Sequence, residues 1–104
     1  MKREELLKQV KEAVHAVEPG ADVILYGSRS RGDSVPDSDW DFLILVDGAV
    51  NDERTDRIRH LLYEIEWETE TVLSSIVRSR NDWNSAMYRS MPFHQRIEHE
   101  GKRL

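Results

Sequence analysis

The sequence contains no cysteine, which excludes disulfide frameworks, thiolate zinc sites and cysteine nucleophiles. It has no apolar run of membrane-spanning length, and its first residues lead into an amphipathic pattern rather than the apolar core of a signal peptide. A basic surplus is missing too: 15 Lys and Arg stand against 20 Asp and Glu, for a formal net charge of −5. Because nucleic-acid binding needs a dense cationic surface, we expect no direct DNA or RNA binding. From the lack of a membrane-spanning run and of a signal-peptide pattern, we expect a cytoplasmic protein that does not associate with membranes.

The 104 residues suffice for one domain, spanning 1–104, with a single modest core. Apolar periodicity and turn residues predict helices at 2–17, from Asn51 or Asp52, after Asn81 or Asp82, and at 92–100. Strands are predicted at 23–26, 40–46 and 69–77, the first two buried on both faces. Residues 27–38 form a loop with room for one helical turn, and Lys102 and Arg103 form a solvated tail. This order predicts an α/β (α+β) fold, a small mixed sheet of three to four strands covered by helices.

The loop after the first strand has a composition suited to phosphate binding. Gly27 lets the backbone turn sharply and approach a ligand closely. Ser28 can donate its hydroxyl, and the successive amides of Ser28 to Ser30 can form an anion-binding concavity. Arg29 and Arg31 offer charged forks for phosphate oxygens, although they could instead balance nearby aspartates. Without those aspartates, the loop would be interpreted as a polar connector.

Two of these aspartates open the second strand. Strand alternation sends Asp39 and Asp41 to one face and Trp40 to the other. Two residues on one face are about 6.5–7 Å apart, so both carboxylates can bind one Mg²⁺ or bracket a pair of ions. Hard oxygen ligands favour Mg²⁺ or Mn²⁺. In combination with the loop, the pair predicts a metal and nucleotide site rather than a solvated strand entrance.

Gly27-Ser28 followed by Asp39-Trp40-Asp41 resembles the signature of the DNA polymerase β-like nucleotidyltransferase superfamily. The fuller stretch from Tyr26 to Gly32 is similar to its smallest members, the minimal nucleotidyltransferase (MNT) antitoxins that pair with HEPN toxins. By this resemblance, Gly27 and Ser28 hold the triphosphate of ATP, and Asp39 and Asp41 hold Mg²⁺ as catalytic residues. Trp40 is larger than the aliphatic residue usual at that position.

The third carboxylate of the family is expected on the strand after the long helix, where this chain has Ser74 and Ser75. Glu66, Glu68 and Glu70 lie upstream at even spacing. Glu70 is the first choice for a third metal ligand, because in a strand over 69–77 it would share a face with Ser74.

The resemblance implies an enzyme that transfers AMP from ATP to a hydroxyl, on a partner HEPN toxin, and thereby silences that toxin. One alternative is an antitoxin with a degenerate site that neutralises its toxin by binding. A second alternative is small-molecule nucleotidylation. Four aromatic residues could form a partner-binding patch, but packing in the core is favoured for them: Trp67, Trp83, Tyr88 and Phe93. The four histidines have no metal-ligand spacing and are expected on the surface or at helix ends.

Overall fold

The computed structural model describes residues 2–36 and 38–104, which form a four-stranded mixed sheet in the order β3-β2-β1-β4. The strands are β1 (Asp22–Tyr26), β2 (Trp40–Val46), β3 (Leu73–Ser79) and β4 (Lys102–Arg103). β1 runs antiparallel to both β2 and β4, whereas β2 and β3 are parallel. The predicted mixed sheet of three to four strands is confirmed.

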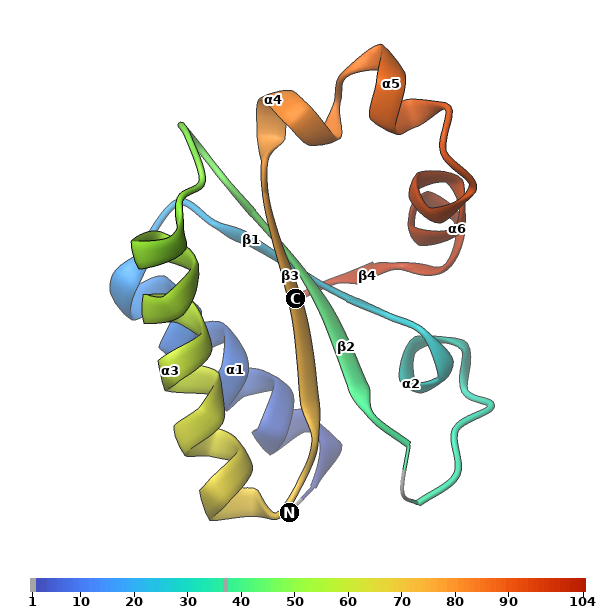
Figure 1. The fold of residues 1–104 in the computed structure, drawn as a ribbon. Helices are drawn as coiled ribbons and strands as arrows, with labels where there is room; N and C mark the ends of the chain where they lie inside the picture. Colours follow the sequence, from blue (N-terminus) through green and yellow to red (C-terminus); the bar gives the residue numbers. More distant parts are fainter. Residues whose placement is uncertain (1, 37) are drawn as a thin grey trace.

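Helices cover both faces of this sheet (Figure 1). α1 (Arg3–Val17) and α3 (Asp52–Thr69) lie on one face, while α4 (Arg80–Trp83), α5 (Ala86–Arg89) and α6 (Pro92–Glu100) lie on the other. A short helix, α2 (Ser28–Arg31), follows β1 directly. None of the helices in residues 2–36 and 38–104 is long and apolar enough to cross a membrane.

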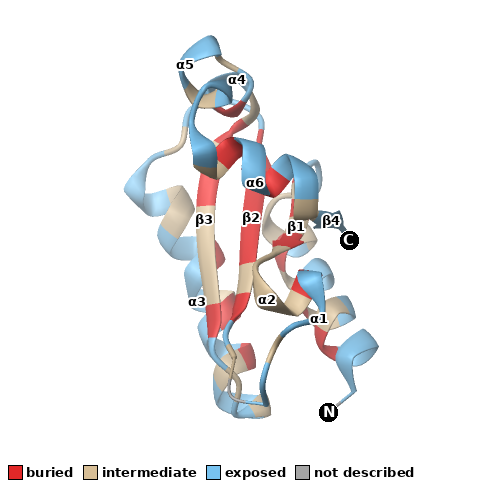
Figure 2. Cartoon of the chain, turned by 90° about the vertical axis from the view of Figure 1, so that its right-hand side faces the viewer, coloured by how far each residue is buried: buried red, intermediate tan, exposed pale blue. Residues whose placement is uncertain are grey.

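β2 is the central strand and is almost entirely buried (Figure 2). Its residues alternate between two clusters: Trp40, Phe42, Ile44 and Val46 face α1 and α3, and Leu43 and Leu45 pack against Trp83 and Ile97. β1 differs from the prediction, because only Val23 and Leu25 are fully buried and the alternate residues are partly exposed. On that second face, Ile24 and Tyr26 pack only at the margin of the cluster that includes Trp83 and Ile97.

The long helices follow their apolar stripes closely. Leu6, Val10 and Val14 of α1 are buried. On α3, Asn51 caps the first turn by accepting a hydrogen bond from the Arg54 amide at 2.8 Å. Both ends of α1 and the start of α3 agree with the sequence-based boundaries to within one residue.

The predicted strand over 69–77 is wrong at its start. α3 continues to Thr69, whose hydroxyl donates to the Ile65 carbonyl at 2.7 Å, and Glu70 ends the helix in the left-handed region with φ of 54°. β3 begins only at Leu73. The β-branched residues at 69–72 therefore form the helix end and a connection, because the amphipathic stripe of α3 outweighs their intrinsic strand preference.

Four other predictions need correction. Neither Asn81 nor Asp82 caps the short helix α4, which begins at Arg80 and is capped by Ser79, whose hydroxyl accepts from the Asp82 amide at 3.1 Å. Lys102 and Arg103 are not a free tail but pair with Leu25 and Ile24 as β4. His94 is buried and stacks on Trp83 with ring centroids 4.3 Å apart. Trp67 is 74% exposed on α3, in contrast to Trp83, which is buried in the core as predicted.

Candidate active site

The site residues predicted from the sequence meet at one end of the sheet, where β1 ends beside the start of β2. Tyr26 pairs with Asp41 in the antiparallel register, so the next residue, Gly27, lies directly against the Asp41 side chain. A Cβ at Gly27 would overlap Asp41 Oδ2 and lie 3.3 Å from Asp41 Cγ. Gly27 also has φ of 78° and ψ of −161°, a conformation essentially restricted to glycine. Glycine at 27 is therefore what allows the loop to wrap around the carboxylate.

The two aspartates lie at the entrance of β2, as predicted. Asp39 is exposed just before the strand, and Asp41 is partly buried within it. Burial raises the pKa of Asp41 above its ordinary value, the charge of Asp39 raises it further, and the charge of Arg31 opposes both effects. Burial and the charge of Asp41 likewise raise the pKa of Tyr26. A cation would therefore relieve an unfavourable concentration of negative charge around Asp41.

The first residues of the loop after β1 form regular structure, the short helix α2. The amides of Ser30 and Arg31 both donate to the Gly27 carbonyl at 3.0 Å, which makes α2 a single helical turn. The Ser30 amide is therefore already paired, and only part of the predicted amide concavity remains available. The Ser30 side chain is buried and donates to the Glu100 carbonyl of α6. α2 is thus fixed at a defined place beside Asp41.

The two arginines of the loop have different environments. Arg29 lies over the Trp40 ring at 4.4 Å and donates to the carbonyls of Pro36 and Ser38, so its guanidinium secures the loop. Arg31 is 44% exposed, and its partners are the carboxylates of Asp33 and Glu100. It is close enough to Asp41 for its charge to affect the pKa of that group. This placement favours Arg31 over Arg29 for binding phosphate.

The structure does not place a carboxylate where the family resemblance expects the third one. Asp41 pairs with Ser74 in the parallel register. Glu70 caps α3 and lines a surface hollow with Arg29 and Trp40, rather than sharing the strand face of Ser74. Within residues 2–36 and 38–104, no three Asp, Glu, His or Cys side chains form a group that could hold a metal ion. The strand-face argument for Glu70 is therefore wrong, and its role as a ligand stays a prediction.

Glu100 is a site residue that the sequence does not point to, since it stands there only as the end of the predicted helix at 92–100. Its side chain is 6% exposed, and its Oε2 accepts from Arg31 Nη1 at 2.8 Å. Its charge contributes to the raised pKa of Asp41. Glu100 and Arg31 are 69 residues apart in the chain, so no local pattern could have shown that they pair.

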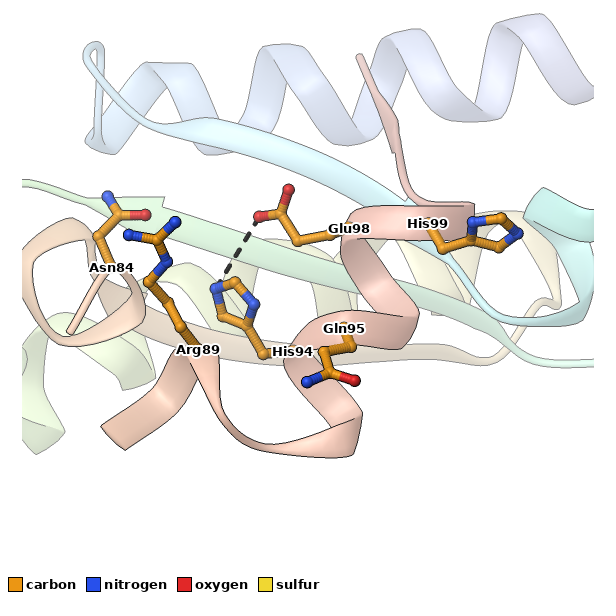
Figure 3. Close-up of a pocket in the computed structure, with 6 residues that line it drawn as sticks. All are labelled: Asn84, Arg89, His94, Gln95, Glu98 and His99. Atoms are coloured by element: carbon orange, nitrogen blue, oxygen red, sulfur yellow. Dashed lines mark ion pairs between the residues drawn. The ribbon is translucent and has the colours of Figure 1, made fainter. Parts of the chain in front are cut away.

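A hollow of about 550 Å³ opens beside α2 and is lined by Ser30, Arg31, Arg96, His99, Glu100 and Lys102. Three of these side chains are permanently cationic, so the hollow suits an anionic ligand. A second hollow, of about 670 Å³, lies over α4 to α6, where Asn84, Arg89, His94, Gln95, Glu98 and His99 line it (Figure 3). None of the residues predicted to bind nucleotide or metal lines this second hollow, which therefore lies outside the candidate active site.

The residues present fit a divalent cation at Asp39 and Asp41. Two oxygen donors of the hard type stand at the strand entrance, and Gly27 leaves space against Asp41 that any side chain would fill. Oε1 of Glu100, whose charge also raises the pKa of Asp41, is buried without a hydrogen-bond donor among the described residues. With two direct carboxylates, a Mg²⁺ ion would complete its coordination with water and substrate oxygens.

Comparisons with known proteins agree with this architecture. The crystal structure of a toxin–antitoxin with AMP-PNP superposes with a TM-score of 0.64 and 16% identity, covering 98% of this chain and 72% of the other. A mutant of the toxin–antitoxin MntA-HpeT superposes with a TM-score of 0.60 and 14% identity, covering 99% and 72%. Among curated protein sequences, none matches significantly. Residues 4–102, however, match the nucleotidyltransferase domain family. The chain is therefore a member of the nucleotidyltransferase domain family, with the fold found in structures of toxin–antitoxin complexes.

Proposed function

We propose that this protein is a Mg²⁺-dependent nucleotidyltransferase that moves AMP from ATP to a hydroxyl of a toxin partner. The observation that carries the proposal is the close approach of Gly27 to Asp41, with Asp39 alongside. This close approach brings the loop proposed to bind phosphate and the carboxylate pair together at one end of the sheet. The similarity in fold to a toxin–antitoxin crystallised with AMP-PNP, an ATP analogue, supports the same chemistry.

In this proposal, each group at the site has a separate task. Asp39 and Asp41 hold the metal, which when bound supplies Lewis-acid stabilisation of the phosphate oxygens. The backbone at Gly27 and the hydroxyl of Ser28 position the β- and γ-phosphates. Arg31 balances the charge that develops on pyrophosphate. The attacking hydroxyl oxygen forms a bond to the α-phosphorus, the bond from that phosphorus to the β-phosphate oxygen breaks, and the hydroxyl proton passes to water.

The proposed partner is a toxin of the HEPN type. A toxin partner is supported by the two solved structures described above, which are toxin–antitoxins. The HEPN type follows from the resemblance of the motif alone. The acceptor is then a tyrosine or a similar hydroxyl on the toxin, and modification there would silence it.

Mass spectrometry of the co-purified partner after incubation with this protein, ATP and Mg²⁺ tests the proposal. We expect a mass gain of one or more AMP units, absent with Asp41→Ala. Asp47→Ala is the matched control, since Asp47 follows the opposite end of β2 and is largely exposed. No mass gain with the wild-type protein, or an equal gain with Asp41→Ala, would contradict the enzymatic proposal.

Neutralisation by binding alone is the second candidate function, and two observations favour it. No group of three metal-binding side chains occurs in the described part of the chain. In addition, Tyr63 and Trp67 are exposed at adjacent turns of α3, beside a hollow of about 320 Å³ that Glu66 and Glu70 also line. Exposed aromatic residues are typical contact points in interfaces, and the glutamates suit a basic partner surface. Full protection against the toxin by Asp39→Ala/Asp41→Ala would establish this function and refute the enzymatic one.

A further inference from the structure

β3 lies at the margin of the sheet, and the backbone groups on its outer edge are only partly paired (Figure 2). The Trp40 amide donates to the Val72 carbonyl at 2.9 Å, so that carbonyl faces β2. Backbone groups alternate along a strand, so those of Leu73, Ser75 and Val77 face away from β2. On that side, the sheet formed by residues 2–36 and 38–104 has no further strand.

Side chains cover the two ends of this edge and leave its middle open. Glu66 Oε2 accepts from the Leu73 amide at 2.9 Å, and Arg78 Nη1 donates to the Val77 carbonyl at 2.8 Å. The Leu73 carbonyl, both backbone groups of Ser75 and the Val77 amide have no hydrogen-bond partner in the described part of the chain. Proteins usually protect an exposed edge with charged side chains, because a free edge pairs with other chains. The protection of β3 stops short of Ser75, so the edge can accept a further strand there.

A groove runs beside this open stretch, between β3 and α3. One hollow, of about 340 Å³, is bounded by Leu62, Tyr63 and Glu66 of α3 and by residues 73–75 of β3. It shares Tyr63 and Glu66 with the hollow of about 320 Å³ beside Trp67, so the two hollows together form one edge groove. A helix on one side and an open strand edge on the other is the arrangement that binds extended peptides by strand addition.

The charge around the edge groove favours a basic occupant. Residues 61–77 contain four Glu and neither Lys nor Arg. Two of these glutamates, Glu66 and Glu70, line the groove, where Arg59 is the basic residue. Tyr63 is 58% exposed and adds apolar surface between the glutamates. An extended segment that carries apolar and basic side chains on one face matches both properties, since alternate residues of a strand share a face.

We propose that the edge groove binds such an extended segment of a partner protein as an additional strand beside β3. The inference goes beyond the proposed function, because it holds whether the partner is modified or only bound. A second copy of this chain fits the groove less well. It would offer its own β3, whose Leu73 and Val77 side chains are buried in its own core, so only Ser75 could enter the groove. Main-chain hydrogen bonds supply affinity in this mode, and the hollow beside Tyr63 supplies specificity.

The docked segment would lie close to the candidate active site. Asp41 pairs with Ser74 in the parallel register. The added strand is therefore two strand spacings, or about 10 Å, from Asp41. The same contact that holds the partner would place its neighbouring residues within reach of the site.

Fluorescence anisotropy with a labelled peptide, Thr-Val-Thr-Lys-Thr-Val-Thr-Lys, tests the proposal. Alternation puts its valine and lysine side chains on one face, toward α3. We expect saturable binding, and binding about tenfold weaker or more for the peptide with glutamate in place of lysine. Two N-methylated forms probe the edge itself, one methylated at the valine and lysine amides and the other at the threonine amides. Because alternate amides face β3, one form should lose binding and the other should keep it.

A backbone variant probes the same contact from the side of the protein. Ser75→Pro removes the outward amide and should weaken peptide binding about tenfold or more. The hydrogen bonds to β2 come from Ser74 and Ile76, so proline is tolerated at this edge position. Ser75→Ala is the matched control and should bind the peptide as the wild type does, since its backbone is unchanged.

The outcomes separate the possible occupants. If circular dichroism shows that Ser75→Pro does not fold, the two methylated peptides decide with the wild-type protein alone. Equal affinity of the wild type and Ser75→Pro, or loss of binding with both methylated forms or with neither, would overturn the inference, as would the absence of saturable binding. A wild-type dimer in sedimentation equilibrium that Ser75→Pro dissociates would assign the edge to a second copy and overturn it as well.

Discussion

Replacing Gly27 by alanine tests whether the close approach of the loop to Asp41 is as tight as the structure shows. The backbone conformation at 27 is nearly exclusive to glycine, and forcing another residue into it costs about 1–3 kcal/mol. The added methyl group also overlaps Asp41 Oδ2, and overpacking of this kind costs about 1–3 kcal/mol more. We therefore expect Gly27→Ala to lower the free energy of unfolding by about 2–6 kcal/mol.

Gly32→Ala is the matched control. Gly32 also has a positive φ, of 87°, but a Cβ there would meet nothing within 4 Å. Backbone strain alone should cost about 1–2 kcal/mol. Urea unfolding followed by tryptophan fluorescence and circular dichroism measures both variants, since Trp40 and Trp83 are buried.

A double-mutant cycle separates the overlap from the strain. In an Asp41→Ala background, the atoms that Gly27→Ala would overlap are gone, so its cost should fall by about 1–3 kcal/mol. Equal costs for Gly27→Ala and Gly32→Ala, with no coupling to position 41, would refute the reasoning. In that case Gly27 would serve only the backbone turn.

Other consequences can be measured directly. Because the pKa of Asp41 is raised in the folded protein, its ionisation destabilises the fold as pH rises through that pKa. Asp41→Asn should therefore raise the melting temperature of the metal-free protein at pH 7. The same variant should remove any stabilisation by Mg²⁺ and nucleotide. A lower melting temperature for Asp41→Asn would contradict this assignment. Arg54 donates two hydrogen bonds to Glu18 and lowers the pKa of that carboxyl, so the pair stabilises the protein above the ordinary glutamate pKa and is lost as pH falls through the lowered value. Glu18→Gln should therefore cost about 1–3 kcal/mol at pH 7 and progressively less in acid, and a pH-independent cost would argue against an ionic contribution. Trp67→Ala should weaken binding of the proposed toxin partner by about 2 kcal/mol, or roughly 30-fold, by calorimetry. Met87 is exposed on α5, over the opposite face of the sheet, so Met87→Ala should leave this affinity unchanged. Equal affinities for the two variants would exclude α3 as the contact surface.

The parts of the fold that sequence predicted well are those whose signals are local. β2 occupies the predicted range because its seven residues are apolar apart from Asp41 and are bounded by a loop and the turn at Asp47-Gly48. α6 begins at Pro92 and ends before Gly101, as the proline and glycine indicated. Gly27, Asp39 and Asp41 also come together as predicted, because a short loop joins neighbouring antiparallel strands.

What could not be predicted depends on partners far away in the chain. Lys102 and Arg103 have no intrinsic preference for a strand, and they form one only because β1 offers a free edge. The residues next to Glu100 in the sequence are typical of any helix end. What distinguishes it are its hydrogen bonds with Arg31 and Ser30, which are distant in the chain. The error at 69–72 has the opposite origin, since β-branched residues gave a strong local signal that the helix stripe overrode.

The hydrogen bond between Ser30 and the Glu100 carbonyl spans 70 residues of sequence, and this separation has a consequence during synthesis of the protein. The loop that begins at Gly27 emerges from the ribosome long before the helix end that fixes it. At about 5–20 residues per second, the interval is roughly 4–14 s. Throughout that time Gly27 and its neighbours lack their anchor, so a nascent or prematurely terminated chain that contains the whole nucleotidyltransferase motif would not hold α2 in its place beside Asp41. Competence therefore arises late, with α6, and translation that stalls before Glu100 yields a product without a formed site.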